Sequence, residues 1–502
     1  MLLKPDVVKD VKIVGFYLGR VISGISVFMA VPLALSLSLG ETDPAADFII
    51  GILSCLFFGL LMYILCYTKQ EPRWIHGMMV VALSWLAAAG FSAVPLFLSG
   101  HFASFLDAYF EAMSGITTSG LSLANDLSHM SYGHNLWRHL IMFMGGQGMV
   151  VVVLSFFLFG SAGGFRLYVG EGRDERVMPN IRQTSRAIWT ISMVFLVLGT
   201  ALLAAIAFQD GMSFKNALFH GACIFMAAFD TGGFSPHHQS IVYYHSWTFE
   251  LATILIMVLG AINFRVHYVV WMGKRAEIWN NVELRALLTT ILGAYFLVAL
   301  GLTFHWQVYP DAVSLFRRGF YQLISAHTGT GFQTIYSDQF LGEWDQLSLF
   351  ALIVAMVLGG AICSTTGGIK MIRLAIIVQA FALEIKHFIA TEASVFFKKV
   401  HHIKTVILNE KQMLSSCLIL LAYVVTVFIG SMVGMMCGYP FLDSLFESAS
   451  ATGNVGLSCG ITAVTMPWVL KISYIVQMWA GRLEFMSVFA VLGFVFALFR
   501  GR

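Results

Sequence analysis

Charged residues are scarce in this chain. Asp, Glu, Lys and Arg together make up 11% of the 502 residues, whereas 58% are hydrophobic and the mean hydropathy is +0.79. A soluble globular domain carries about 25% charged residues, so that class of protein is excluded. The composition indicates a membrane protein that crosses the bilayer many times.

Several motifs of enzymes and metal sites are missing as well. The sequence has no Gly-x-x-x-x-Gly-Lys-Ser/Thr motif and no His-Glu-x-x-His motif, so we do not expect the chain alone to be an ATPase, or an enzyme at all. Its seven cysteines include no Cys-x-x-Cys pair. Cys437 and Cys459 both fall on the expected outer side, where either a disulfide or apolar packing would suit them. The His-His pairs at 237–238 and 401–402 lack ligand partners at metal-site spacing, so we expect solvated surface there.

Ten apolar runs are long enough to cross about 30 Å of hydrocarbon. They lie near residues 14–39, 47–68, 75–99, 136–160, 188–208, 246–272, 284–305, 346–380, 412–437 and 466–498. The first run is too long for a signal peptide, which predicts a retained helix. Most of the 30 Lys and Arg residues fall on the side that holds both termini, so the positive-inside rule predicts cytoplasmic termini. Orientation explains this positive charge, and we expect no nucleic-acid binding.

After its first two helices the chain repeats one unit four times. Each unit has a long apolar helix, a shorter amphipathic segment that ends in a Gly-rich turn, and a second long helix. The turns align without gaps as two small residues, four variable residues, Gly, and Leu or Phe: 114–121, 227–234, 325–332 and 450–457. The shorter segments are Phe105–Met113, Phe214–Met226, Leu315–Ile324 and Phe441–Ala449. We therefore divide the chain into 1–70 (two N-terminal helices) and four pore repeats, 71–165, 166–275, 276–400 and 401–502.

The repeated turns predict four re-entrant pore loops in a pseudo-fourfold arrangement within an all-α membrane protein of ten transmembrane helices. Non-helical backbone is tolerated at membrane depth only where protein or a water-filled path covers it. Glycine lets successive carbonyls turn inward, and rings of carbonyls can replace the hydration shell of a cation. The predicted filter residues are Thr117, Thr118, Ser119, Gly120, Asp230, Thr231, Gly232, Gly233, Thr328, Gly329, Thr330, Gly331, Gly453, Asn454, Val455 and Gly456.

The same residues resemble the TrkH/TrkG/KtrB/HKT superfamily of potassium transporters over essentially the whole chain. Segment 111–120 looks like the first pore of that family and 446–456 like the fourth. The run 359–370 resembles the intramembrane loop of its third repeat, and 481–484 its last helix. Two extra helices before the first repeat favour the TrkH type.

The resemblance implies potassium as the transported ion. In that superfamily, a Gly at the filter position of every repeat goes with potassium selectivity, and all four positions are Gly here. Two positions depart from the family pattern, because Asp230 stands where Asn is usual and Ser119 where Thr is usual. An ionised Asp230 at the filter could deepen cation binding. Alternatively, its carboxyl could be protonated or hydrogen-bonded behind the strand.

A gate is predicted below the filter. The stretch 359–370 interrupts an apolar run of about 35 residues, and its glycines make helix continuity costly, at about 1 kcal/mol each. It could act as a gate or be a static kink, and a weaker break occurs at 260–265. The residues assigned to gate and pore electrostatics are Gly359, Gly360, Ser364, Gly367, Gly368, Lys370 and Arg482.

Three ionisable residues inside the membrane have open roles. By resemblance, Arg482 points into the pathway below the filter; it could instead pair with Glu484 or Glu447. Glu111 and Glu447 hold corresponding places in pore helices one and four. They could support the filter by accepting hydrogen bonds, or raise the cation concentration at its mouth.

These features predict a gated, potassium-selective pore for uptake across the cytoplasmic (inner) membrane. The resemblance implies a homodimer and a TrkA-like cytosolic nucleotide-binding regulator. The inner segments 165–186, 274–285 and 386–411 could dock that regulator or bind anionic membrane lipid. No organic cofactor is expected on the chain. The alternatives are a proton- or sodium-coupled potassium symporter, a polytopic membrane enzyme and a non-conducting ion sensor.

Overall fold

The structure is a computed structural model that describes residues 7–124, 126–148, 181–304, 311–389 and 399–499. Among these residues, six helices are long and apolar enough to cross a membrane, and two bent pairs could each form a further span. The six are α1 (Val7–Leu39), α2 (Thr42–Leu65), α3 (Trp74–Leu98), α8 (Ile181–Gln209), α13 (Val282–Phe304) and α19 (Glu410–Met436). The bent pairs are α10 (Trp247–Ala261) with α11 (Phe264–Trp271), at 99°, and α21 (Trp468–Arg482) with α22 (Met486–Phe499), at 111°. The predicted helical, multi-pass membrane fold is confirmed.

Two predicted spans correspond to shorter or divided helices. The run 136–160 begins in α5 (Tyr132–Gln147), and its part beyond residue 148 lies outside the described residues. The run 346–380 forms α17 (Gln346–Val357) and α18 (Met371–Ile389), which are separated by residues 358–370. We call residues 358–370 the intramembrane loop.

The last predicted span, 466–498, is divided into α21 and α22. The bend occurs between Arg482 and Met486, where Glu484 and Phe485 have φ values of 48° and 63°. Gly481 instead remains in α21. A Cβ on Gly481 would lie 1.9 Å from the carbonyl oxygen of Thr452, so this glycine permits close packing on the fourth pore helix.

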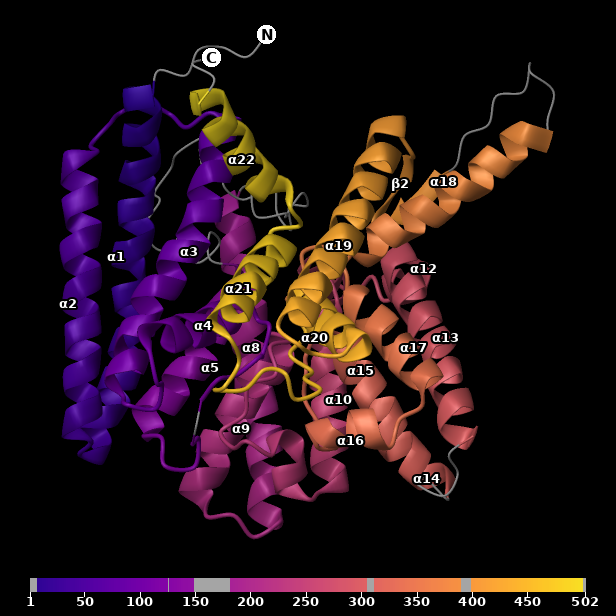
Figure 1. The fold of residues 1–502 in the computed structure, drawn as a ribbon, viewed down its shortest axis with the longest axis horizontal. Helices are drawn as coiled ribbons and strands as arrows, with labels where there is room; N and C mark the ends of the chain where they lie inside the picture. The colour runs from indigo at the N-terminus through magenta and orange to yellow at the C-terminus, as the bar shows by residue number, and fades with distance from the viewer. Residues whose placement is uncertain (1–6, 125, 149–180, 305–310, 390–398, 500–502) are drawn as a thin grey trace.

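Four half-length helices are inserted between the spans, as the repeat predicts. They are α4 (Phe105–Ile116), α9 (Phe214–Phe229), α15 (Tyr321–His327) and α20 (Phe441–Gly453). Helix α15 is preceded by α14 (Ala312–Ser314) and a π-helical turn, η2 (Leu315–Phe320). The last turns of all four are buried, and each is followed by non-helical residues. These pore helices lie between the longer helices in the lower half of Figure 1.

A small hairpin was not foreseen from the sequence. Strands β1 (Lys399–His402) and β2 (Lys404–Ile407) pair antiparallel, with Lys399 opposite Ile407. The hairpin leads into α19 and contacts α13. The remaining short elements are η1 (Ser240–Tyr244), α12 (Glu277–Asn280) and α16 (Ser337–Gly342).

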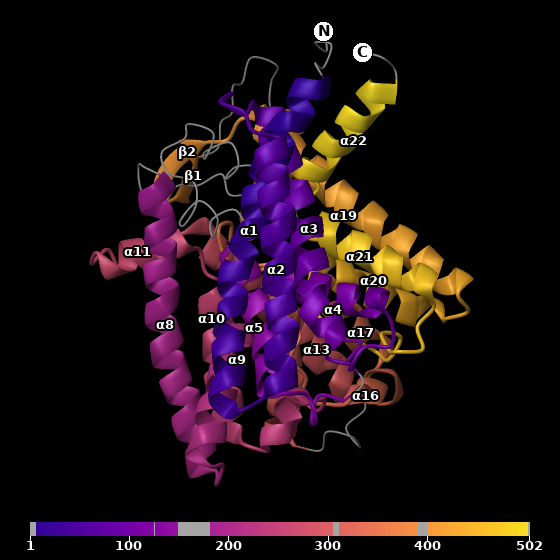
Figure 2. The same cartoon turned by 90° about the vertical axis from the view of Figure 1, so that its left-hand side faces the viewer.

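The first turn of α1 and the last turn of α22 lie at the same end of the molecule, at the top of Figures 1 and 2. The hairpin lies toward this end as well, whereas α14 and α16 lie toward the opposite one. Helices α1 and α2 pack together at one side of the molecule. Large apolar side chains such as Phe57 and Met432 are exposed on α2 and α19, as expected where helices face lipid.

Candidate functional site

The non-helical strands that follow the four pore helices meet in a ring. On each strand one glycine touches the next strand so closely that a Cβ would lie 2.0 to 2.4 Å from a carbonyl oxygen: Gly120 from Gly232, Gly233 from Thr330, Gly331 from Val455, and Gly456 from Ser119. The contacts run from repeat one through two, three and four, and back to one. All four glycines have positive φ, between 72° and 95°, a conformation that glycine adopts without strain. We call these four residues the glycine ring.

Side-chain hydroxyls brace the strands from within the protein. Thr117 Oγ1 donates to a carbonyl four residues earlier at 2.6 Å and lies 2.8 Å from Ser119 Oγ. Repeat three has the same arrangement, with 2.8 Å between the hydroxyls of Thr328 and Thr330. Asn454 Nδ2 donates to Ser119 Oγ at 2.9 Å, which joins repeat four to repeat one. These hydroxyl and amide contacts hold the strands in position around the ring.

Asp230 lies behind the second strand. Its Oδ1 accepts a hydrogen bond from Gln147 Nε2 at 2.9 Å, and Gln147 Oε1 accepts one from Ser192 Oγ at 2.6 Å. A Cβ on Gly146 would lie 2.3 Å from the same Asp230 oxygen. The carboxyl therefore faces α5 and α8, in the hydrogen-bonded position that was one of its two predicted alternatives.

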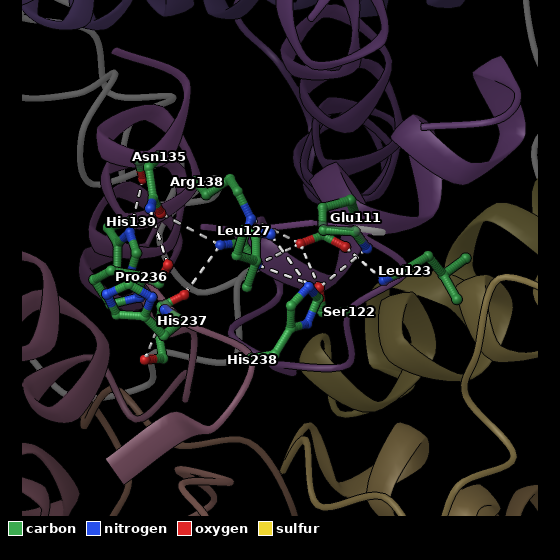
Figure 3. A network of polar contacts seen from close by, with 12 residues as sticks. Glu111, Ser122, Leu123, Leu127, Asn135, Arg138, His139, Pro236, His237 and His238 are labelled. Carbon is green, nitrogen blue, oxygen red and sulfur yellow. Dashed lines mark hydrogen bonds and ion pairs between the residues drawn. The ribbon is translucent and has the colours of Figure 1, made fainter. Parts of the chain in front are cut away.

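Glu111 and Arg138 form a buried ion pair behind the first strand (Figure 3). Arg138 Nη2 lies 2.7 Å from Glu111 Oε1, and both side chains are at most 1% exposed. Glu111 also accepts hydrogen bonds from Ser122 Oγ and Leu123 N, at 2.9 and 2.8 Å. Arg138 Nη1 donates to Ser235 O at 3.2 Å, so the pair joins the segments that follow the first two strands of the ring.

Glu447 has the corresponding place behind the fourth strand. It accepts hydrogen bonds from Ser458 Oγ at 2.5 Å, Cys459 N at 3.1 Å and Thr462 Oγ1 at 2.9 Å. The side chain is fully buried, and its contacts hold the segment after Gly456. Cys437 and Cys459 are both free, so of the two alternatives for this pair the disulfide is not formed.

A cavity of about 180 Å³ borders the ring. All four ring glycines line it, together with Arg138, His237 and His238. His238 Nε2 accepts a hydrogen bond from Leu127 N at 3.1 Å, and the His237 ring stacks on Tyr243 with centroids 3.8 Å apart. Burial, reinforced by neighbouring His238, lowers the pKa of His237. Both histidines therefore line the cavity, where His238 is exposed, as expected, and His237 is half-buried.

The intramembrane loop packs against the ends of two pore helices and against the break between α10 and α11. A Cβ on Gly367 would lie 2.5 Å from Gly453 O, at the end of the fourth pore helix. Thr365 Oγ1 donates to Phe229 O at 2.8 Å, at the end of the second. Ala361 N donates to Ala261 O at 3.0 Å, at the break between α10 and α11. The two predicted breaks, in repeats two and three, therefore touch one another.

Two cations reach this loop. Arg482 Nη1 donates to Thr365 O at 2.6 Å, and its Nη2 donates to Gly145 O in α5 at 2.8 Å. Lys370 Nζ donates to Thr366 O, within the loop itself. Glu484, which was one possible partner of Arg482, pairs with Arg373 at 2.6 Å. Arg482 thus links the loop of repeat three to repeat one.

The predicted docking segments are only partly described. Residues 165–180 and 390–398 lie outside the described residues. Within the described part, His401 Nε2 lies 3.3 Å from Glu277 Oε2. His402 is buried, with Nδ1 3.3 Å from Asn281 Oδ1. The expected solvated position of the second His-His pair is therefore wrong for His402, because the hairpin folds it against α13.

Comparison with known proteins extends this description. The TrkH family, described as cation transport proteins, matches residues 45–495. An uncharacterized cation transporter of Methanocaldococcus jannaschii is 31% identical over 96% of this chain and 95% of its own length. The Trk system potassium uptake protein TrkG of Escherichia coli is 27% identical over 95% and 97%.

A solved structure shares the fold. The crystal structure of the potassium transporter TrkH from Vibrio parahaemolyticus superposes with a TM-score of 0.80. The match covers 96% of this chain and 98% of that one, at 23% sequence identity. The family match spans most of the chain, including all four ring glycines. This protein belongs to the TrkH family of cation transport proteins.

Proposed function

We propose that this protein carries potassium ions across the membrane through the glycine ring. The observation that carries the proposal is the closed circle of contacts among four strands from four repeats. Such a circle presents backbone carbonyls to one axis, where they can replace the hydration shell of a cation. Relatives of this chain are named potassium uptake proteins, which supports potassium as the ion.

The intramembrane loop is the proposed gate. It lies against the ends of the second and fourth pore helices and is held by Arg482. The guanidinium also places a fixed positive charge just below the ring, where it opposes the residence of a cation. Movement of the loop together with Arg482 would therefore open the pathway and remove this charge from it.

The proposal also assigns the orientation in the membrane, the regulatory partner and the oligomeric state. The end with both termini and the hairpin is assigned to the cytoplasm, with transport inward along the membrane potential. A cytosolic nucleotide-binding protein of the TrkA type would dock there, and two copies of the chain would form a dimer in the inner membrane. In this proposal the protein is a transporter and has no catalytic residues.

Rubidium uptake into liposomes tests the proposal. The purified protein, with and without its regulator, is reconstituted and a potential is imposed across the membrane. We expect uptake that depends on the potential and is inhibited by potassium more strongly than by sodium. No uptake under either condition would contradict transport, and a strict need for a pH or sodium gradient would favour the symporter.

A further inference from the structure

A second residue besides Arg482 holds the intramembrane loop. Ile362 N donates to Glu283 Oε1 at 2.8 Å. Glu283 lies in the first turn of α13 and is 1% exposed. A hydrogen bond from a backbone amide to a buried carboxylate is stronger than one between neutral groups. This bond therefore fixes the start of the loop to α13.

The same carboxylate faces the hairpin. Glu283 Oε2 lies 3.6 Å from His402 Nδ1, in strand β1. Asn281 lies between the two, since its Oδ1 accepts from Glu283 N at 2.9 Å and lies 3.3 Å from His402 Nδ1. One oxygen of Glu283 thus contacts the loop, while the other faces His402.

A second acidic residue seats the hairpin without contacting the loop in the described structure. Glu277 Oε1 accepts from Ile403 N at 3.0 Å, and Oε2 lies 3.3 Å from His401 Nε2. Asn281 Nδ2 donates to Glu277 Oε1 at 3.0 Å. The hairpin therefore lies against two carboxylates. Glu277 holds it by a hydrogen bond, whereas Glu283, which also holds the loop, lies 3.6 Å from His402. Glu277 and His401 therefore serve as matched controls for Glu283 and His402.

We propose that Glu283 is a positioning residue that couples the β1–β2 hairpin to the intramembrane loop. With the hairpin docked, His402 packs against Oε2 of Glu283 and contacts Asn281, which accepts from Glu283 N. The Glu283 carboxylate then keeps the loop in the closed position. Displacement of the hairpin by a partner at this end of the molecule weakens the bond to Ile362 N and releases the loop. The inference rests on the proposed function, because it assigns a regulatory input to the same gate.

The first test compares Glu283→Ala and Glu283→Gln with the wild-type protein in the rubidium assay, without the regulator. Glu283→Ala removes the acceptor, and we expect uptake to rise about fivefold or more, the usual lower size of a coupling between sites. Glu283→Gln keeps an oxygen for Ile362 N, so a smaller rise is expected. Rubidium-over-sodium preference should stay unchanged, because the ring is not altered. Folded Glu283→Ala protein with unchanged or lower uptake would overturn the proposal.

A double-mutant cycle tests the link to the hairpin and does not depend on the folding of the alanine variant. We expect His402→Gln to raise uptake in the wild-type background and to have no effect in the Glu283→Gln background. His401→Gln, which faces Glu277, should have no effect in either. Equal effects of His402→Gln in both backgrounds would overturn the coupling. Absence of uptake by the wild-type protein itself, with and without regulator, would instead contradict the proposed transport function.

Discussion

At the scale of single residues, Gly331 shows why the ring depends on glycine. Its φ is 83°, and a Cβ would lie 2.0 Å from Val455 O. An L side chain in this conformation costs about 1–2 kcal/mol, and the contact would push the third and fourth strands apart. We expect Gly331→Ala to lower rubidium-over-sodium preference in the liposome assay.

Gly293 provides the matched control for this substitution. It lies within α13, and a Cβ there would have no atom within 4 Å. Gly293→Ala should therefore leave the ion preference unchanged and, as a helix substitution, slightly stabilise the protein. An unchanged preference in folded Gly331→Ala protein would contradict the assignment of the filter.

The Glu111–Arg138 pair tests the support of the first strand. Glu111→Ala would leave the Arg138 guanidinium buried without this partner, and breaking a buried pair costs about 3–5 kcal/mol. We expect a clearly lower unfolding temperature in detergent. Asp126→Ala is the control, because its ion pair with His129 is largely exposed, with the two side chains 46% and 84% exposed. Such pairs contribute about 0–1 kcal/mol, so equal effects of the two variants would contradict a supporting role for Glu111.

The ring glycines were predictable because the signal occurs four times in register. Each strand needs the same backbone conformation at the same step, so the same residue recurs. Arg138 was not predictable in this way, because its contacts to Glu111 and Ser235 join segments far apart in sequence. For Asp230, the sequence left two alternatives open, and only the packing of α5 places its carboxyl beside Gln147.

At the scale of elements, Arg482 links two parts of the chain that the proposed gate must separate. It ends α21 and donates to Thr365 O in the intramembrane loop and to Gly145 O in α5. Arg482→Ala removes both bonds and the positive charge below the ring. We expect faster rubidium uptake without the regulator in the liposome assay.

A variant elsewhere on the same helix separates this effect from general loosening of α21. Lys471 is in the first turn of α21 and pairs with Asp107 in α4 at 2.5 Å. Lys471→Ala should lower stability without raising uptake. Equal increases for Lys471→Ala and Arg482→Ala would show that the loop tether is not the cause.

Helix existence was easier to predict than helix interruption. Long apolar runs must form helices in hydrocarbon, and the runs are clear in the sequence. The last predicted span, 466–498, is occupied by α21 and α22, but its bend at Glu484 and Phe485 was not predicted from the sequence. Gly481, the nearby glycine, allows close packing instead. The hairpin at 399–407 was missed because its short strands lack a clear alternation and are held by contacts to Glu277 and Glu283.

At the scale of the whole molecule, the cavity beside the ring is shared by all four repeats. Each repeat contributes one glycine to its lining, and repeat two adds His237 and His238. In the proposed function, a cation crosses this cavity to reach the ring. A charge on His237 would then act on every ion, whichever strand later binds it.

External pH should change transport through His237. Because burial and His238 lower its pKa below the ordinary 6.5, the ring is neutral at pH 7 and gains its charge only as pH falls further. In the unfolded chain, His237 takes up its proton at a higher pH than in the folded protein. The contribution of the neutral His237 imidazole to folding stability is therefore complete above pH 6.5 and is lost as pH falls through the pKa of the folded state. A charged His237 imidazole in the cavity repels cations, so we expect rubidium uptake to fall on external acidification. His237→Gln should reduce this fall, whereas His129→Gln, which is not in the cavity lining, should not. Identical pH profiles for wild-type and His237→Gln protein would contradict this role.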